Sequence, residues 1–137
     1  MSEPGTLSLS VRIEASPDEV FPYLTDSSLI TTWIGNEADL QPEPGGRFSL
    51  DIGETLVRGR FIVVEPPHHI VFTWGVPGDA ELPEGSTTVD IRLVADGPDT
   101  IVELTHLDLP ASQLDGHRAG WIEHLDILPA EAARARA

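Results

Sequence analysis

Unbroken alternation near the N-terminus is the feature that most constrains the fold. From residue 7 to residue 15 every second side chain is apolar, namely Leu7, Leu9, Val11, Ile13 and Ala15. Successive side chains of a β-strand point to opposite faces, so this segment predicts a strand with one wet face and one buried face. Such a strand needs an apolar layer to cover its buried side.

Helix signals follow directly. Ser16-Pro17-Asp18-Glu19 combines an N-cap serine, a proline at the first helical position and a glutamate placed for a capping box. We expect one short helix from there to Leu24. A second should run from residue 26 or 27 to Ile34, with Gly35-Asn36 as its stop.

Strand and turn patterns fill the chain from there to about residue 109. Apolar runs at 47–52, 56–65, 70–74, 86–94 and 100–107 are separated by turn residues and by one acidic loop at 75–85 that is rich in proline and glycine. Strands joined by short connections predict an antiparallel meander. The expected architecture is α+β, with a sheet of about six or seven strands.

A helical stripe near the C-terminus supplies the covering layer. It consists of apolar and aromatic residues at spacings of three and four, with one histidine: Leu114, His117, Trp121, Leu125 and Leu128. Pro129 interrupts this pattern. We therefore expect one domain over residues 1–137, with a core from about 7 to 128 and a mobile tail at 129–137.

Composition excludes several partners. The net charge is −15, cysteine is absent, and each of the eight basic residues is an arginine. Nucleic-acid binding needs clustered cations, so we expect no nucleic acid and no anionic membrane as partner. The N-terminus lacks the basic start and apolar run of a secretory signal, so we expect a cytoplasmic protein.

Face assignment places a histidine on an apolar surface. Arg58 and Arg60 should face water, which turns Val57, Gly59, Phe61 and Val63 inward. The same alternation turns inward Phe48, Leu50 and Ile52, then Ile70, Phe72 and Trp74, then Val89, Ile91 and Leu93, and finally Val102, Leu104 and His106. His106 is either a polar anchor or proton-transfer group for a ligand, or a core-edge histidine bonded to the backbone. His117 has the same two interpretations.

Metal and cofactor motifs are missing. His117 and His124 are seven residues apart, which on a helix is roughly 10 Å of rise, too far for one ion. No phosphate loop, nucleophile elbow or dinucleotide fingerprint occurs. We expect no metal and no cofactor.

Local motifs in a fixed order resemble a known family. They are Trp33, Pro44-Gly45-Gly46-Arg47-Phe48, Gly59, Pro66-Pro67, Phe72-Thr73-Trp74, Leu104-Thr105-His106 and His117-Arg118-Ala119-Gly120-Trp121. The chain resembles the SRPBCC (START and birch-pollen-allergen-like) superfamily, in the branch of the activator of heat-shock-protein ATPase homologues. The resemblance implies a helix-grip fold, in which a curved sheet grips the last helix around an apolar cavity.

Three functions follow as hypotheses. The first is binding of a small hydrophobic or aromatic molecule by Trp33, Phe48, Phe61, Phe72, Trp74, His106, His117 and Trp121. The second is a polyketide cyclase or dehydratase that moves a proton with His106 or His117. The third is a co-chaperone-like or regulatory domain that binds another protein through its acidic face. The sequence leaves open whether the chain is an enzyme and whether it forms a homodimer.

Overall fold

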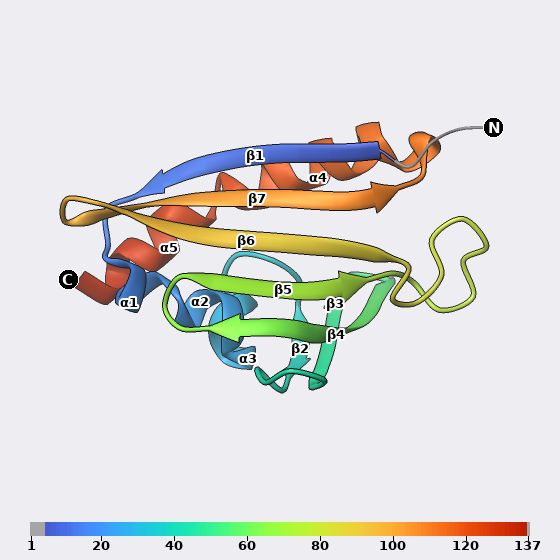
Figure 1. Cartoon of the computed structure of the whole chain (residues 1–137), viewed down its shortest axis with the longest axis horizontal. Helices are drawn as coiled ribbons and strands as arrows, with labels where there is room; N and C mark the ends of the chain where they lie inside the picture. Colours follow the sequence, from blue (N-terminus) through green and yellow to red (C-terminus); the bar gives the residue numbers. More distant parts are fainter. Residues whose placement is uncertain (1–4, 137) are drawn as a thin grey trace.

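Seven strands form one antiparallel sheet in the computed structural model, which describes residues 5–136. The strands are β1 (Gly5–Ile13), β2 (Glu37–Leu40), β3 (Arg47–Ile52), β4 (Thr55–Glu65), β5 (His69–Trp74), β6 (Thr87–Asp96) and β7 (Asp99–Leu109). Their order is β1-β7-β6-β5-β4-β3-β2 (Figure 1). The predicted α+β helix-grip architecture is confirmed.

Three short helices follow β1 where the sequence predicts two: α1 (Pro17–Val20), α2 (Pro22–Thr25) and α3 (Ser27–Ile30). The predicted capping box is present, because the Ser16 side chain accepts from the Glu19 amide and the Glu19 carboxylate accepts from the Ser16 amide. Pro22 has no N–H to continue α1, so a new helix begins there.

The last of these helices is shorter than predicted. α3 ends at Ile30 rather than Ile34. The Thr31 and Thr32 hydroxyls donate to carbonyls three residues back, those of Ser28 and Leu29. Side-chain bonds of this kind compete with the regular helical ladder.

A seventh strand, β2, lies where the sequence predicted none. It pairs antiparallel with β3 and forms one edge of the sheet. Its four residues, Glu-Ala-Asp-Leu, have low intrinsic strand propensity, so pairing with β3 determines its conformation.

The sheet bends sharply along β4. A Cβ atom on Gly59 would lie 1.9 Å from the carbonyl oxygen of Thr73, so only glycine permits the close approach of the two chain segments. Figure 1 shows β2 and β3 running across the direction of β6 and β7. The bend thereby turns the β3–β4 hairpin into a side wall of the concave face.

A β-bulge corrects one face assignment. The pairing of β4 with β5 shifts register between Phe61 and Val63. Beyond the shift, Val64 pairs with Ile70 and packs against the core, so the prediction that Val63 points inward is wrong. An extra residue in one strand reverses the face to which each later side chain of that strand points.

The other inward assignments on the concave face are confirmed. Each of the following is less than a tenth exposed: Phe48, Leu50, Val57, Phe61, Ile70, Phe72, Trp74, Val89, Ile91, Leu93, Val102, Leu104 and His106. The apolar ones form one cluster with residues of α1, α2 and α3 and of the C-terminal helices. The core therefore lies between the sheet and the helical layer.

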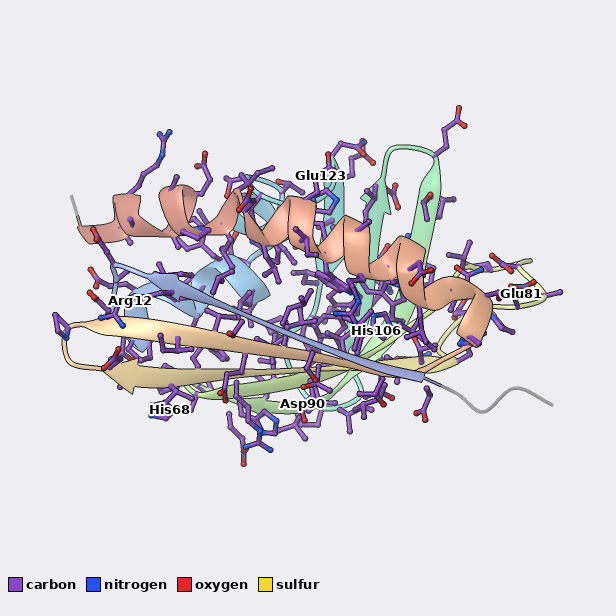
Figure 2. All side chains as sticks on the ribbon, turned by 90° about the horizontal axis from the view of Figure 1, so that it is seen from above. Arg12, His68, Glu81, Asp90, His106 and Glu123 are labelled. Atoms are coloured by element: carbon purple, nitrogen blue, oxygen red, sulfur yellow. The ribbon has the colours of Figure 1, made fainter. Side chains whose placement is uncertain are left out.

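The C-terminal helices cover the concave face (Figure 2). They are the single 3₁₀ turn η1 (Ala111–Gln113), α4 (Leu114–Leu125), α5 (Leu128–Ala133) and the turn η2 (Arg134–Arg136). Trp121, Leu125 and Leu128 of the predicted stripe are buried, and Leu114 and His117 are half-buried.

The helical pattern is interrupted at residues 126–127, and Pro129 lies in the first turn of α5, so the segment after it is helical and packed. Leu128 and Ala132 are both fully buried in the core. Mobility of residues 129–137 stays a prediction, and its last residue lies outside the described part of the chain. Within residues 5–136, no helix has the length and apolar character needed to cross a membrane.

Candidate functional site

A groove of about 400 Å³ opens between α4 and the bent part of the sheet. We call it the α4 groove. One wall is α4, and the other is formed by the β3–β4 hairpin and the loop between β5 and β6. Its apolar lining is contributed by Ile34, Ile52, Val57, Trp74, Val76, Leu82 and Trp121. Its polar lining is Thr55, Asp79, Gln113, His117 and His124.

Two glycines hollow out the α4 wall. Gly116 and Gly120 lie one turn apart and both line the groove. A Cβ atom built on either would meet nothing within 4 Å. A glycine inside a helix is less stable than alanine by roughly 0.5–1 kcal/mol, so two of them weaken α4 without any steric demand from the chain itself. Their effect on shape is to leave open space beside the helix.

His106 lies below α4 (Figure 2), with its ring next to those of the groove residues Trp74, His117 and Trp121. The Trp121 indole N–H donates to its Nδ1 over 3.0 Å. The accepting Nδ1 carries no proton, so neutral His106 holds its proton on Nε2, 2.8 Å from the Thr87 hydroxyl oxygen. The Thr87 hydroxyl in turn donates to the carbonyl of Trp74 over 2.7 Å.

This chain of bonds fixes His106 as a neutral side chain. Burial, and secondarily the nearby His117, lower the pKa of His106 to about 3. The side chain is fully buried and both ring nitrogens have partners. A ligand or a substrate proton can reach His106 only if one of these bonds breaks first.

His117 has a different environment although its ring centre is only 5.2 Å from that of His106. Its Nδ1 lies 3.0 Å from the carbonyl of Gln113, and the side chain is half-buried in the groove wall. Burial lowers its pKa, opposed in part by this hydrogen bond. His117 is therefore a neutral side chain with one nitrogen committed to the backbone.

The predicted aromatic residues divide into two groups. Trp74 and Trp121 line the groove with ring centres 5.2 Å apart. Phe48 stacks on Phe72 at 3.9 Å and meets Phe61 edge-on at 5.7 Å. The second group fills the middle of the sheet.

Packing leaves little space in that second group. Phe48, Phe72 and Trp33 surround an enclosed space of about 10 Å³, which is at the lower limit for one water molecule. The Trp33 indole N–H donates to the carbonyl of Tyr23 over 2.8 Å. Of the eight residues predicted to bind a ligand, Trp74, His117 and Trp121 line the α4 groove. A ligand contact for any of the eight stays a prediction.

Sequence reasoning missed several groove residues. Gly116, Gly120 and His124 share one face of α4 with His117 and Trp121, at spacings of three and four. The four-residue spacing of the two glycines beside an aromatic helical stripe is the sequence signal that could have indicated an open helix face. Val76 and Leu82 belong to the long β5–β6 loop, and no periodicity predicts their position.

Exposed hydrogen bonds hold that loop against the start of the helical layer. Ser112 and Gln113 both donate to the Glu81 carboxylate, at 2.5 Å and 3.3 Å, and these bonds lower the pKa of Glu81. Figure 2 shows Glu81 at the N-terminal end of α4. Over the described residues, no three histidine, aspartate or glutamate side chains are grouped as a metal site.

Comparison with known proteins gives a family match. The model of the family described as Activator of Hsp90 ATPase homolog 1-like protein matches residues 14–133. The human Activator of 90 kDa heat shock protein ATPase homolog 1 is 26% identical over 116 residues, which are 84% of this chain and 33% of the human protein. This chain thus spans about a third of the length of the curated relatives it matches.

Solved structures share the fold. An AHSA1-like protein from Rhizobium etli is 35% identical, with a TM-score of 0.72 over 97% of this chain and 86% of that one. An Aha1 dimer from Colwellia psychrerythraea is 15% identical, with a TM-score of 0.82 over 97% of this chain and 99% of that one. At that identity the second likeness is one of fold alone.

Proposed function

The chain belongs to the family of Activator of Hsp90 ATPase homolog 1-like proteins, and from this premise and the shape of the α4 groove we propose that it binds a small hydrophobic or aromatic molecule. The observation that carries the proposal is the open space beside Gly116 and Gly120. Helix-interior glycines with no neighbour in the chain weaken the helix but leave room for a molecule from outside.

The size and lining of the groove support the same function. Its volume of about 400 Å³ lies in the range of sites for small ligands. Trp74 and Trp121 offer aromatic surface, and the polar side chains are few. Apolar walls with a small number of orienting polar groups are typical of small-molecule sites.

A matched pair of variants tests the proposal. Gly120→Leu directs a side chain into the open space, whereas Ala119→Leu places the same side chain on the exposed side of α4. We expect an aromatic probe to quench tryptophan fluorescence and raise the Tm of the unsubstituted protein and of Ala119→Leu. Gly120→Leu should abolish both effects. A panel of aromatic and aliphatic probes that neither quenches nor stabilises the unsubstituted protein would contradict the proposal.

An enzymatic role is the second candidate, supported by His117. Its nitrogen Nδ1 is bonded to Gln113 and its ring lines the groove, so Nε2 is the proton acceptor available to a substrate. His106 is unsuited because both of its nitrogens are bonded. Mass spectrometry of a bound polyketide-like compound tests this role: a product that His117→Gln no longer forms supports it, and an unchanged compound contradicts it.

A protein-binding role is the third candidate, supported by the name of the human relative, an activator of a 90 kDa heat shock protein ATPase. The net charge of −15 favours a basic partner surface. Adding this protein to such an ATPase should raise its turnover in low salt and less in high salt. The homodimer that the sequence leaves open is tested by sedimentation, and the Colwellia structure supplies the precedent of a dimer in this fold.

A further inference from the structure

The two histidines of the α4 groove present the same kind of atom to it. His117 Nδ1 lies 3.0 Å from the carbonyl of Gln113, and His124 Nδ1 lies 3.3 Å from the carbonyl of Trp33. A carbonyl oxygen only accepts hydrogen bonds, so each Nδ1 carries the ring proton. In the neutral imidazole the remaining nitrogen, Nε2, then has a lone pair and accepts.

Neither Nε2 atom is buried. Within residues 5–136, the hydrogen bonds of these two rings involve Nδ1 alone, and no buried side-chain nitrogen or oxygen lacks a partner. An unpartnered Nε2 is therefore not buried. Both residues line the groove, so each exposed Nε2 is an acceptor that a ligand bound there can use.

The groove offers no cation to a ligand. None of its lining residues is an arginine, and the chain contains no lysine. The charged group in the lining is the Asp79 carboxylate. Moving a ligand carboxylate from water to this site would remove its hydration without supplying a counter-charge. Negative ligands are therefore disfavoured.

We propose that the α4 groove selects an uncharged, elongated aromatic molecule with a hydroxyl donor at each end, one for Nε2 of His117 and one for Nε2 of His124. The seven-residue separation of the histidines corresponds to about 10 Å along α4, which two linked aromatic rings span. Trp74 and Trp121 lie beside His117 to contact those rings. This specificity rests on the proposed ligand-binding function.

Three probes of the same shape test it: biphenyl-4,4′-diol, its dimethyl ether and biphenyl-4,4′-dicarboxylate. Calorimetry at pH 7.5 should give the diol an affinity about tenfold or more above that of the ether, which accepts but does not donate. The dicarboxylate should bind more weakly than the diol by at least as much. Equal or tighter binding of the ether or the dicarboxylate overturns the proposed specificity while leaving ligand binding itself intact.

Substitutions of His117 distinguish its role as a hydrogen-bond acceptor from the packing of its ring against the ligand. His117→Leu should lower the affinity for the diol by about tenfold and leave the ether nearly unchanged. His117→Gln, whose side-chain oxygen also accepts, should recover part of the preference. His68→Leu, on a histidine that bonds to Leu93 away from the groove, is the control and should change neither affinity.

The two failures are distinguishable. Binding of none of the three probes, with the fold of the protein intact by circular dichroism, contradicts the proposed function and this specificity with it. Binding of all three with similar affinity contradicts the specificity alone. An unaltered preference for the diol in both His117→Leu and His124→Leu would also overturn it, because the donors would then lack their assigned acceptors.

Discussion

His106 and His117 lie side by side, yet one belongs to a closed core and the other to an open groove. His106 is fully buried with both nitrogens bonded, and His117 is half-buried with one nitrogen bonded to the backbone. Their rings are 5.2 Å apart. The difference arises from what lies opposite: a tryptophan of α4 covers His106, whereas two glycines of the same helix leave the space near His117 open.

The contrast teaches that one helix sets both environments. Trp121 covers His106, because its ring fills the space beside the histidine and its N–H donates to the buried Nδ1. Gly116 and Gly120 contribute no side chain, so the space beside this part of the helix stays open. Substitutions on α4 should therefore change the two regions separately.

Removal of Trp121 should have the largest effect on stability. Trp121→Ala deletes a side chain that is only 4% exposed and leaves Nδ1 of His106 without its donor. We expect a loss of about 3–5 kcal/mol in the free energy of unfolding, measured by urea denaturation. Trp121→Phe keeps most of the packing and should cost about 1–3 kcal/mol for the orphaned acceptor. Little or no loss in Trp121→Phe would mean that the hydrogen bond contributes nothing, and equal losses in the two variants would contradict the contribution of packing.

Acidification should lower the free energy of unfolding, because the unfolded chain takes up a proton on His106 that the folded chain does not. Its pKa is lowered from 6.5 to about 3 in the folded protein, so between these values the unfolded chain binds the proton and the folded chain does not. The contribution of neutral His106 to the free energy of unfolding is therefore fully present well above pH 6.5 and is lost as the pH falls, by roughly 1.6 kcal/mol between pH 6.5 and pH 5.

A variant without a titrating ring isolates this contribution. His106→Gln should show a shallower decline of unfolding free energy over the same pH range, in denaturant titrations at constant ionic strength. His117, whose pKa is also lowered, contributes in the same direction and is retained in both proteins. Parallel declines in the two proteins would refute the assignment of the pH dependence to His106.

Replacing the glycines of the groove should have the smallest effect on stability, and these substitutions should stabilise the protein. Gly116→Ala and Gly120→Ala should each raise the free energy of unfolding by roughly 0.5–1 kcal/mol, since the added methyl meets no atom. Affinity for an aromatic probe should fall at the same time. Ala119→Gly on the exposed side of α4 should lose similar stability and keep the affinity. Destabilisation by either alanine would show that the space beside the glycines is not free.

Local pattern alone determined most of the fold. Alternation assigned the faces of β3, β5, β6 and β7, and the helical stripe placed Trp121 on the sheet, because period-two and period-3.6 patterns depend only on neighbours along the chain. Ser16 and Glu19 determined the start of α1 for the same reason: both partners of the capping box lie within four residues.

Tertiary structure decided the rest. The bulge at Phe61 and Val63 and the edge strand β2 depend on pairing with other strands. The hydrogen-bond partners of the His106 ring are the side chains of Thr87 and Trp121, which the fold brings to it from β6 and α4, and not the backbone group that one interpretation expected. Whether an inward aromatic residue becomes core or groove lining depends on what the chain places opposite it. That opposite partner is distant in sequence, so no local pattern encodes it.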